Sequence, residues 1–168
     1  MRSTLLVIKM SNIYLSLGTN LGDRRANLHA ALDALPPEVL VRARSKIYET
    51  PAWGFEEQPA FLNMAIRADT DLKPEPLLRH LKQLENRLGR EPSFHWGPRL
   101  IDIDLLFYDR LVLDTPQLVI PHPRLQERAF VLVPLADVAP DLLHPVLGKT
   151  VHQLLEGLDK SGIVPVSE

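Results

Sequence analysis

The sequence predicts an α+β protein: a ferredoxin-like β-α-β-β-α-β antiparallel sheet with helices on one face, followed by a C-terminal extension. Three observations lead to this fold class: stretches of alternating apolar residues, two amphipathic stretches bounded by capping or breaking residues, and the order of these stretches. The 168 residues suit one domain, which we expect to span residues 1–168, with residues 1–9 as a loose N-terminal extension.

The first strand and helix can be followed from the N-terminus. Apolar and polar residues alternate over residues 13–17 and predict a strand that ends at Gly18. Asp23 is a favourable N-cap for a helix with one apolar face, and this helix reaches Leu35. The dipeptide Pro36-Pro37 then stops it, because proline lacks the backbone N–H that a continuing helix needs.

Three more strands and a second helix follow. Residues 39–48 and 61–68 are predicted strands, separated by a loop rich in proline and aromatic residues. Pro74 opens a helix whose leucines form one stripe, and Gly89 takes the C′ position after it. Beyond a further loop, residues 101–108 have the composition of a buried strand.

The extension begins near Leu111 and runs to the C-terminus. We expect a short strand pair, a helix near residues 127–138 and a last helix around residues 151–158. Internal repeats and low-complexity linkers are absent from the sequence, which supports the expectation of a single domain.

Composition excludes several classes of protein. A hydrophobic fraction of 45% and a charged fraction of 24% are typical of a globular protein in water. A formal net charge of -2 gives no reason to expect nucleic acid or an anionic membrane as a partner. The absence of cysteine excludes disulfides and thiolate metal sites, and no apolar run approaches the roughly 20 residues that span a bilayer. We therefore expect a cytoplasmic protein, and since nothing in the sequence demands an oligomer, we expect a monomer.

Two acidic residues interrupt the last predicted strand of the sheet. Because side chains alternate along a strand, Asp102 and Asp104 share one face, and the apolar residues up to Phe107 share the other. The two aspartate Cα atoms should lie about 6.6 Å apart. Carboxylates that close repel one another unless a cation intervenes, and oxygen ligands favour a hard ion such as Mg²⁺ carrying phosphates. The alternative is that both aspartates simply face solvent on an exposed sheet surface.

The residues around this pair each allow two interpretations. Arg99 offers a planar fork of donors to a phosphate, or it forms a structural salt bridge with the aspartates. His122, between two prolines, either donates to a phosphate or satisfies a local carbonyl. Arg90 and Arg128 are phosphate ligands or solvated surface charges, and Trp96 lines a base pocket or covers core.

A second set of residues suits a flat heterocycle. Phe61 and Phe130 could sandwich a ring between them, although two ordinary core phenylalanines are the simpler interpretation. Asn63 lies two positions after Phe61 and shares its face of the strand, where its amide could pair with a donor–acceptor edge of the ring.

Together, these motifs resemble those of the 6-hydroxymethyl-7,8-dihydropterin pyrophosphokinase family. The resemblance covers roughly residues 13–143 and rests on the stretches YLSLGTNLGD, YETPAWGFEEQPAFLN, LENRLGR, WGPRLIDIDLLFY and VIPHPRLQERAFVLVPL. It implies an enzyme of folate biosynthesis that transfers pyrophosphate from ATP to the pterin alcohol, with AMP as the second product. The pattern WGPR-x-x-D-x-D followed by P-H-x-x-x-x-x-R is its most specific part.

The resemblance also implies roles for individual residues. Two Mg²⁺ ions that hold the ATP triphosphate would be bound by Asp102 and Asp104. Catalytic roles would belong to Arg90, Arg99, Asp102 and Asp104. Contacts to ATP would come from Glu85, Trp96, Arg99, Leu105, His122 and Arg128. The pterin pocket would be formed by Thr50, Pro51, Trp53, Phe61, Asn63 and Phe130.

The sequence departs from the family pattern at several positions. Phe61 stands where many members have a tyrosine, a change that keeps ring stacking. The third loop contains Glu91, Pro92 and His95, where many members have basic residues, and Lys82 and Gln117 also replace other side chains. We expect these changes in the third loop to weaken its cationic contacts with ATP without abolishing activity.

Two other classes of protein compete with this interpretation. The same element order builds RNA-recognition modules, but the third strand AFLNMAIRA lacks their basic-glycine-aromatic signature, and two carboxylates would repel an RNA backbone. A D-x-D phosphohydrolase would use one aspartate as nucleophile. That class is typical of a parallel sheet and usually has a threonine after the motif, whereas Leu105 and Leu106 follow it here.

Overall fold

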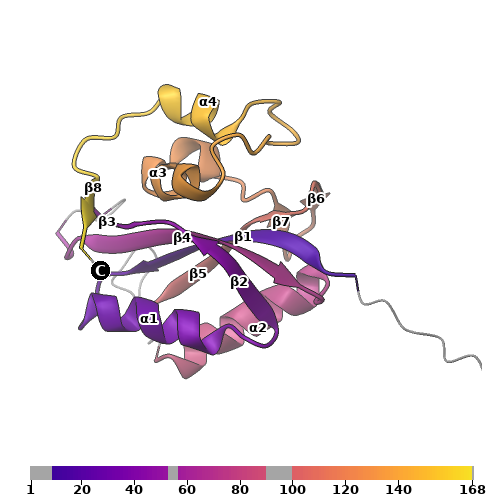
Figure 1. Cartoon of the computed structure of the whole chain (residues 1–168), viewed down its shortest axis with the longest axis horizontal. Helices are drawn as coiled ribbons and strands as arrows, with labels where there is room; N and C mark the ends of the chain where they lie inside the picture. Colours follow the sequence, from indigo (N-terminus) through magenta and orange to yellow (C-terminus); the bar gives the residue numbers. More distant parts are fainter. Residues whose placement is uncertain (1–8, 53–56, 90–99, 168) are drawn as a thin grey trace, which may run out of the picture.

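The computed structural model describes residues 9–52, 57–89 and 100–167 and has a mixed α+β architecture with a central antiparallel sheet. The strands of this sheet are β1 Ser11–Thr19, β2 Val39–Arg44, β3 Ile47–Thr50, β4 Phe61–Thr70, β5 Asp102–Tyr108 and β8 Val164–Val166. Their hydrogen-bonded order is β5-β1-β4-β3-β8, and β2 pairs with β4 next to β3 (Figure 1). The strand β1 therefore lies between β4 and β5 and can bring side chains from both together.

Two helices cover one face of the sheet (Figure 1). They are α1, Arg24–Ala34, and α2, Pro74–Arg87, and their buried leucines pack on apolar residues of β1, β4 and β5. The predicted start signals are confirmed, because Asp23 caps α1 by accepting a backbone N–H at 3.0 Å and Pro74 occupies the first turn of α2. Gly89 follows α2 with a φ of +90°, as expected for a C′ glycine.

The expected placement of α1 and α2 on one face is confirmed, but the opposite face of the sheet is also covered, by helices of the C-terminal extension whose position the sequence did not predict. The extension supplies a 3-10 turn, Leu125–Glu127, then α3, Ala129–Val138, and α4, Val151–Glu156. Figure 1 shows α3 and α4 on the side of the sheet away from α1 and α2. They form a second apolar core with residues of β1, β4 and β5. None of the described helices combines the length and apolar character needed to cross a membrane.

The single strand predicted over residues 39–48 is divided in two, which corrects that prediction. Between β2 and β3, the backbone N–H of Ser45 donates to the carbonyl of Ala65 at 2.9 Å. The Ser45 hydroxyl in turn accepts the N–H of Ala65, also at 2.9 Å. A side chain thus interrupts the regular ladder between β2 and β3, although both strands pair antiparallel with β4.

The rest of the extension contains one predicted feature and one that was not predicted. The expected strand pair is confirmed as β6, Leu113–Asp114, and β7, Val119–Ile120, joined by a tight turn. The strand β8 was not predicted. It pairs antiparallel with β3 and brings the C-terminus back to the main sheet.

His144 holds the loop between α3 and α4 through its imidazole ring. Its Nδ1 accepts the backbone N–H groups of Val146 and Leu147 at 3.2 and 3.1 Å. The ring packs edge-on against Phe107, with 5.8 Å between centroids. Burial lowers the pKa of His144 below its ordinary value, which favours a neutral ring at pH 7. Protonation would place a hydrogen on Nδ1 and remove the acceptor.

We expect the free energy of unfolding to decrease as the pH falls below about 6.5, the ordinary pKa of histidine. In that range the unfolded chain binds a proton that folded His144 resists, so acid favours unfolding until the pH passes the lowered folded pKa. Above pH 7 both states are neutral, and His144 adds no pH dependence. Denaturant unfolding between pH 5 and 8 should show a larger acid loss in the wild type than in His144→Gln. Parallel curves for the two proteins would contradict this role.

Candidate active site

The two aspartates of β5 lie on the sheet face away from α1 and α2. In the antiparallel register Asp102 is opposite Gly18 and Asp104 is opposite Ser16, both on β1. The aspartates are partly exposed, whereas Ile103 between them is only 1% exposed and belongs to the core under α1 and α2. The predicted placement of both carboxylates on one accessible face is therefore confirmed.

The alternation along β5 breaks immediately after the aspartates. The register with β1 jumps between Leu15–Leu105 and Tyr14–Phe107, which leaves Leu106 as the extra residue of a bulge. Phe107 therefore contacts Tyr14 on the side of α3, with ring centroids 6.1 Å apart, and not the core of Leu105 as we predicted. Because of the bulge, the face of β5 that carries the aspartates continues after Asp104 with apolar residues that belong to the core under α3.

Glu85 of α2 holds β5, the strand that carries the two aspartates, through a hydrogen bond to its backbone. Its side chain is 1% exposed, and its Oε1 accepts the backbone N–H of Ile103 at 2.9 Å. The ammonium group of Lys82 lies 3.4 Å from the same oxygen. This hydrogen bond fixes the position of β5 relative to α2. Because Ile103 lies between the two aspartates, the bond also fixes where Asp102 and Asp104 lie. The expected contact of Glu85 with ATP stays a prediction. The hydrogen bond to Ile103 gives Glu85 a structural role in addition.

His122 lies close enough to Asp104 to respond to its charge. Burial lowers the pKa of His122, and the negative charge of Asp104 opposes this shift. The imidazole Nδ1 accepts the backbone N–H of Arg124 at 3.2 Å, while the backbone N–H of His122 donates to the carbonyl of Leu106 at 3.0 Å. In the neutral ring the hydrogen is then assigned to Nε2, which can donate to a ligand.

Arg128 places a cationic group near the acidic pair. Its side chain is 8% exposed, and burial lowers the pKa of the guanidinium. The charges of Asp104 and Asp102 oppose that shift, which shows that both carboxylates lie within electrostatic range. The guanidinium carbon also lies 5.7 Å from the centre of the Phe130 ring. The structure thus brings together four of the predicted site residues: Asp102, Asp104, His122 and Arg128.

A pocket of about 230 Å³ opens beside Asp104 and His122. One wall is the hairpin β6–β7, the others come from α2 and β5, and Lys82 lines it as well. Of the residues that we expected at ATP, Leu105 and His122 line this pocket. The other lining residues, which the sequence analysis assigned to no site, are Leu78, Lys82, Ile103, Thr115, Pro116, Gln117, Leu118, Val119 and Pro123.

On the other side of the aspartates, Gly18 of β1 lies directly against the side chain of Asn63. Gly18 is opposite Asp102 on one side and opposite Asn63 on the other, so the three residues form one row across the sheet. A Cβ at Gly18 would lie 2.7 Å from Asn63 Oδ1 and 3.8 Å from Phe61 Cδ1. The absence of a side chain at Gly18 therefore lets the Asn63 amide lie directly against the β1 backbone, one strand away from Asp102.

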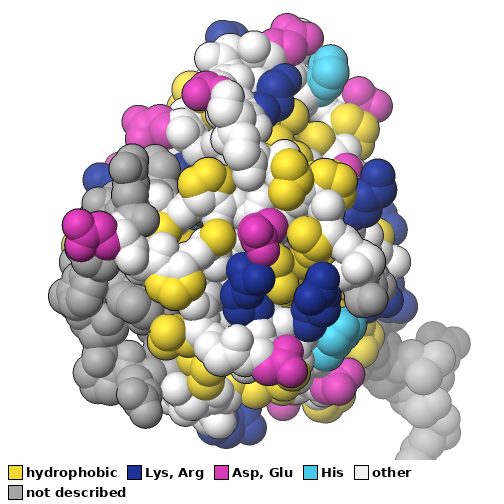
Figure 2. Space-filling model, turned by 90° about the vertical axis from the view of Figure 1, so that its left-hand side faces the viewer, with side chains coloured by type: hydrophobic (Ala, Val, Ile, Leu, Met, Phe, Trp, Pro, Cys, Tyr) yellow, Lys and Arg dark blue, Asp and Glu magenta, His cyan; other side chains and the backbone are white. Residues whose placement is uncertain are grey.

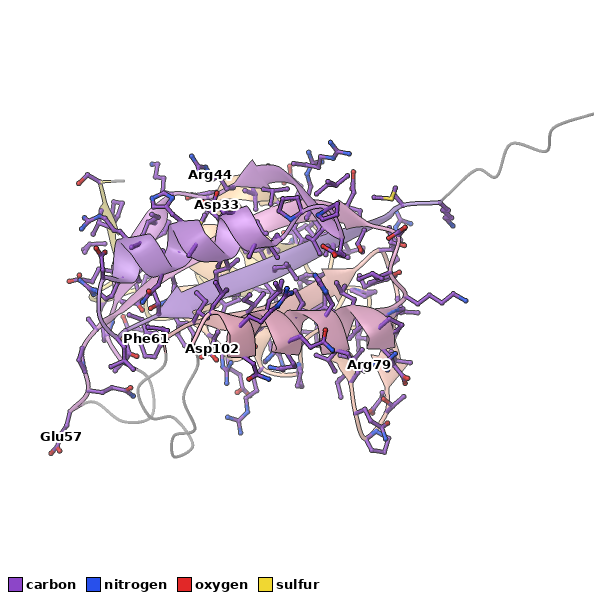
Figure 3. The ribbon with its side chains drawn as sticks, turned by 90° about the horizontal axis from the view of Figure 1, so that it is seen from below. Asp33, Arg44, Glu57, Phe61, Arg79 and Asp102 are labelled. Atoms are coloured by element: carbon purple, nitrogen blue, oxygen red, sulfur yellow. The ribbon has the colours of Figure 1, made fainter. Side chains whose placement is uncertain are left out.

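Several residues predicted to bind a ring lie around Gly18 and Asn63. Asn63 Nδ2 donates to Thr50 Oγ1 at 2.6 Å, and both side chains are buried. Phe61 is paired with Thr50 at the end of β4, and Figure 3 shows Phe61 and Asp102 at the same end of the sheet. Phe130, in the first turn of α3, is half-buried beside Arg128. A stacking contact between Phe130 and a ligand stays a prediction.

Four predicted site residues, Trp53, Arg90, Trp96 and Arg99, lie outside the described residues. The chain re-enters the described part at Leu100, whose carbonyl accepts a hydrogen bond from the hydroxyl of Thr19. Asn27 Nδ2 donates to the same hydroxyl at 3.1 Å. Thr19 and Asn27 were not predicted as site residues, since nothing local in the sequence shows that they anchor the start of the acidic strand.

The acidic pair suits a magnesium ion that also binds phosphate. Within residues 9–52, 57–89 and 100–167, no group of three or more histidine or acidic side chains could hold a metal by itself. Mg²⁺ is commonly bound by one or two carboxylates together with water and substrate phosphates. Asp102 and Asp104 supply two such carboxylates. The neighbouring guanidinium of Arg128 would repel a bare cation but favours one that carries a polyphosphate.

Comparisons with known proteins agree with this geometry. The family model described as 7,8-dihydro-6-hydroxymethylpterin-pyrophosphokinase matches residues 14–140. A 2-amino-4-hydroxy-6-hydroxymethyldihydropteridine pyrophosphokinase of Methylorubrum extorquens is 47% identical over 156 residues, which are 92% of this chain and 98% of that protein. A protein of the same name from Aquifex aeolicus is 41% identical over 144 residues, covering 86% of this chain and 90% of its own length.

A solved structure extends the similarity to the fold. The wild-type HPPK-DHPS of Plasmodium falciparum, crystallised with pteroate, superposes with a TM-score of 0.72 at 18% identity. The superposition covers 88% of this chain and 42% of that longer chain. At this identity the likeness concerns the fold alone.

Proposed function

The chain belongs to the 7,8-dihydro-6-hydroxymethylpterin-pyrophosphokinase family, and from this premise we propose how its residues divide the work of the reaction. The enzyme is a diphosphokinase of folate biosynthesis that transfers pyrophosphate from ATP to 6-hydroxymethyl-7,8-dihydropterin. The hydroxymethyl oxygen forms a bond to the β-phosphorus of ATP. The bond from that phosphorus to the oxygen bridging to the α-phosphorus breaks, AMP leaves, and the proton of the hydroxyl group passes to the solvent.

One observation carries the assignment of the two substrates: the row Asn63–Gly18–Asp102 across three neighbouring strands. Strands lie about 4.8 Å apart, so Asn63 and Asp102 are separated by about 10 Å with only Gly18 between them. A flat ring bound to Asn63 over Gly18 would point its substituent at the acidic strand. This arrangement supports placing the pterin over Gly18 and the phosphates at Asp102 and Asp104.

The pterin pocket is proposed to use the hydrogen bond between Asn63 and Thr50. Since Nδ2 of Asn63 is held by Thr50 Oγ1, its Oδ1 is oriented towards Gly18 and can accept from a ring N–H. Phe61 and Phe130 would stack on the two faces of the ring, with Pro51 and Trp53 completing the pocket. Because Asn63 and Thr50 are already fixed by one another, little conformational entropy is lost on binding.

The phosphates are proposed to bind among Asp104, His122 and Arg128. Mg²⁺ ions held by Asp102 and Asp104 would supply charge neutralisation for the polyphosphate. His122 would donate from Nε2 to a phosphate oxygen, and Arg128 would offer its guanidinium. These donors are fixed before the substrate arrives, so they can stabilise charge that develops during the transfer.

The nucleoside end of ATP is proposed to occupy the pocket of about 230 Å³ between α2, β5 and the hairpin β6–β7. Leu105 and Leu118 give this pocket apolar surface, while Gln117 and the backbone groups of the turn offer hydrogen bonds. The pocket continues to Asp104 and His122, so a nucleotide bound there reaches the acidic strand with its phosphates.

The remaining proposed contacts concern residues that the structure does not describe. Arg99 and Trp96 are proposed to contact ATP, and Arg90 is proposed to assist the transfer. The weaker cationic contacts expected from the third loop also stay a prediction. We further propose that residues 1–168 act as one pyrophosphokinase domain and as a monomer.

Product analysis tests the reaction directly. When the enzyme is incubated with ATP, Mg²⁺ and the pterin alcohol, we expect AMP and the pterin diphosphate to form in equal amounts. Chelation of Mg²⁺ with EDTA should stop both, because the charge of the triphosphate is then not neutralised. Chromatography of the nucleotides separates AMP from ADP, and a sample without pterin is the control. Formation of ADP would contradict transfer of two phosphates in one step.

A further inference from the structure

The C-terminal segment Asp159–Ser167 returns to the main sheet beside the pterin pocket. It lies beyond residues 14–140, which the family model matches, and no role follows for it from the reaction. Its strand β8 pairs with β3 from Ile47–Val166 to Glu49–Val164. At its end, Arg25 Nε of α1 donates to the carbonyl of Ser167 at 2.9 Å. The segment is thus held by the sheet and by α1 (Figure 1).

The turn before β8 touches the loop that follows β3. Gly162 has a φ of +80°, and a Cβ there would lie 2.9 Å from Pro51 Cγ and 3.5 Å from Pro51 Cδ. The backbone of Gly162 therefore lies directly against the proline ring. Asp159 shapes this turn, since its carboxylate accepts the backbone N–H and the hydroxyl of Ser161 at 2.9 and 2.5 Å. These hydrogen bonds lower the pKa of Asp159, as expected for a carboxylate that they stabilise.

The contact matters because Pro51 directly follows Thr50. The Thr50 hydroxyl accepts the hydrogen bond that orients Asn63. Strand β3 is only four residues long. It pairs with β4 on one side and with β8 on the other. A short strand with two neighbours is held more firmly than an edge strand. Figure 2 faces this side of the molecule and shows apolar side chains interspersed with charged ones.

We propose that the segment Asp159–Ser167 is a positioning element for the pterin pocket. It fixes β3 through β8 and presses the turn at Gly162 against Pro51, which keeps Thr50 in place to orient Asn63. This proposal rests on the assignment of Thr50, Pro51 and Asn63 to the pterin. The nucleotide pocket is formed by α2, β5 and the β6–β7 hairpin, so the segment should act on the pterin and not on ATP.

The substitution Gly162→Ala tests the contact, with Gly148→Ala as a matched control. Both glycines have positive φ, +80° and +66°, so both variants carry the same kind of backbone strain. At Gly148 no described heavy atom lies within 4 Å of the added Cβ, whereas at Gly162 it meets Pro51. We expect Gly162→Ala to raise the KM for the pterin roughly three- to tenfold with the KM for ATP unchanged, because small misplacements near a site are costly. Gly148→Ala should change neither constant.

A double substitution separates the contact from a general loss of stability. In Pro51→Ala the ring carbons that meet the new Cβ are absent, so adding Gly162→Ala should raise the pterin KM no further. Arg25→Ala provides a second route, because it releases the end of β8 without strain at Gly162, and a smaller rise in the same constant is expected. Thermal unfolding of every variant records stability separately.

The outcomes distinguish this proposal from the assignment of the pocket. If Asn63→Ala leaves pterin binding intact, the pocket assignment itself is wrong. If Asn63→Ala weakens pterin binding while Gly162→Ala behaves like Gly148→Ala, the pocket stands and the positioning role is refuted. Equal rises of the pterin and ATP constants in Gly162→Ala would also refute it, as would a rise of the same size in the Pro51→Ala background.

Discussion

Replacement of Asp104 with asparagine should lower turnover by about three orders of magnitude, because a bound metal contributes several kcal/mol to the stabilisation of transition-state charge. Asparagine keeps the shape of the side chain but removes the negative charge that would hold Mg²⁺ next to His122 and Arg128. Asp102→Asn should have an effect of the same order, since Asp102 shares the face and the strand. Steady-state assays over a range of Mg²⁺ concentrations should show a rise in the concentration needed for half-maximal activity.

The control for this experiment is Asp71→Asn, which removes an exposed carboxylate outside the site. It should leave turnover and the Mg²⁺ dependence unchanged. The melting temperatures of Asp102→Asn and Asp104→Asn should stay near that of the wild type, since both carboxylates are partly exposed. Turnover within a few fold of the wild type in both variants would refute the assignment of the metal to this pair.

The second large effect is expected from Gly18→Ala. The new Cβ would lie 2.7 Å from Asn63 Oδ1, so the amide must move away from the position in which Thr50 holds it. The methyl group would also stand between Asn63 and Asp102 in the row that these residues form with Gly18 across the sheet. We expect pterin affinity to fall by at least about tenfold, given that 1 Å displacements near a reacting group can cost about 10²-fold. Equilibrium binding of the pterin, with an unreactive ATP analogue present, measures this change.

Gly157→Ala is the matched control for Gly18→Ala. Neither glycine has a positive φ, so alanine is conformationally acceptable at both positions. At Gly157 no atom of the described residues lies within 4 Å of the added Cβ. Gly157→Ala should therefore bind pterin like the wild type. If Gly18→Ala also bound pterin normally, the space above Gly18 would not be the pterin site.

Local signals in the sequence were sufficient for the elements that begin and end with distinctive residues. Asp23 before α1, and Pro74 and Gly89 at the two ends of α2, each act through their own backbone geometry. The placement of Asp102 and Asp104 on one face also follows from alternation alone, because it needs only the period of a strand.

The features that sequence analysis missed depend on residues far apart in the chain. The bulge at Leu106 inserts one residue against β1, and nothing within the run of apolar residues in β5 marks which residue is extra. The strand β8 has only three residues, which form a strand because β3 offers an unpaired edge. The division at Ser45 likewise depends on its hydroxyl reaching Ala65 across the sheet.

The site shows the same division between local and distant information. The motif that contains the acidic pair was recognisable, and so were His122 and Arg128. The pocket beside them, which we propose for the nucleotide, is lined by the β6–β7 hairpin, whose position depends on packing with distant residues. Glu85 was expected at ATP from resemblance alone. Its hydrogen bond to Ile103 joins α2 to β5 across a separation of 18 residues, which no periodicity reveals.

The position of Pro165 in β8 has a consequence for the behaviour of the chain in concentrated solution. The strand β8 is the last in the hydrogen-bonded order, so its free side is where a strand from another molecule would have to add. Pro165 is the middle residue of this three-residue edge strand and has no backbone N–H to donate. An incoming strand would find an interrupted row of donors, which disfavours self-assembly into extended β-structure along this border.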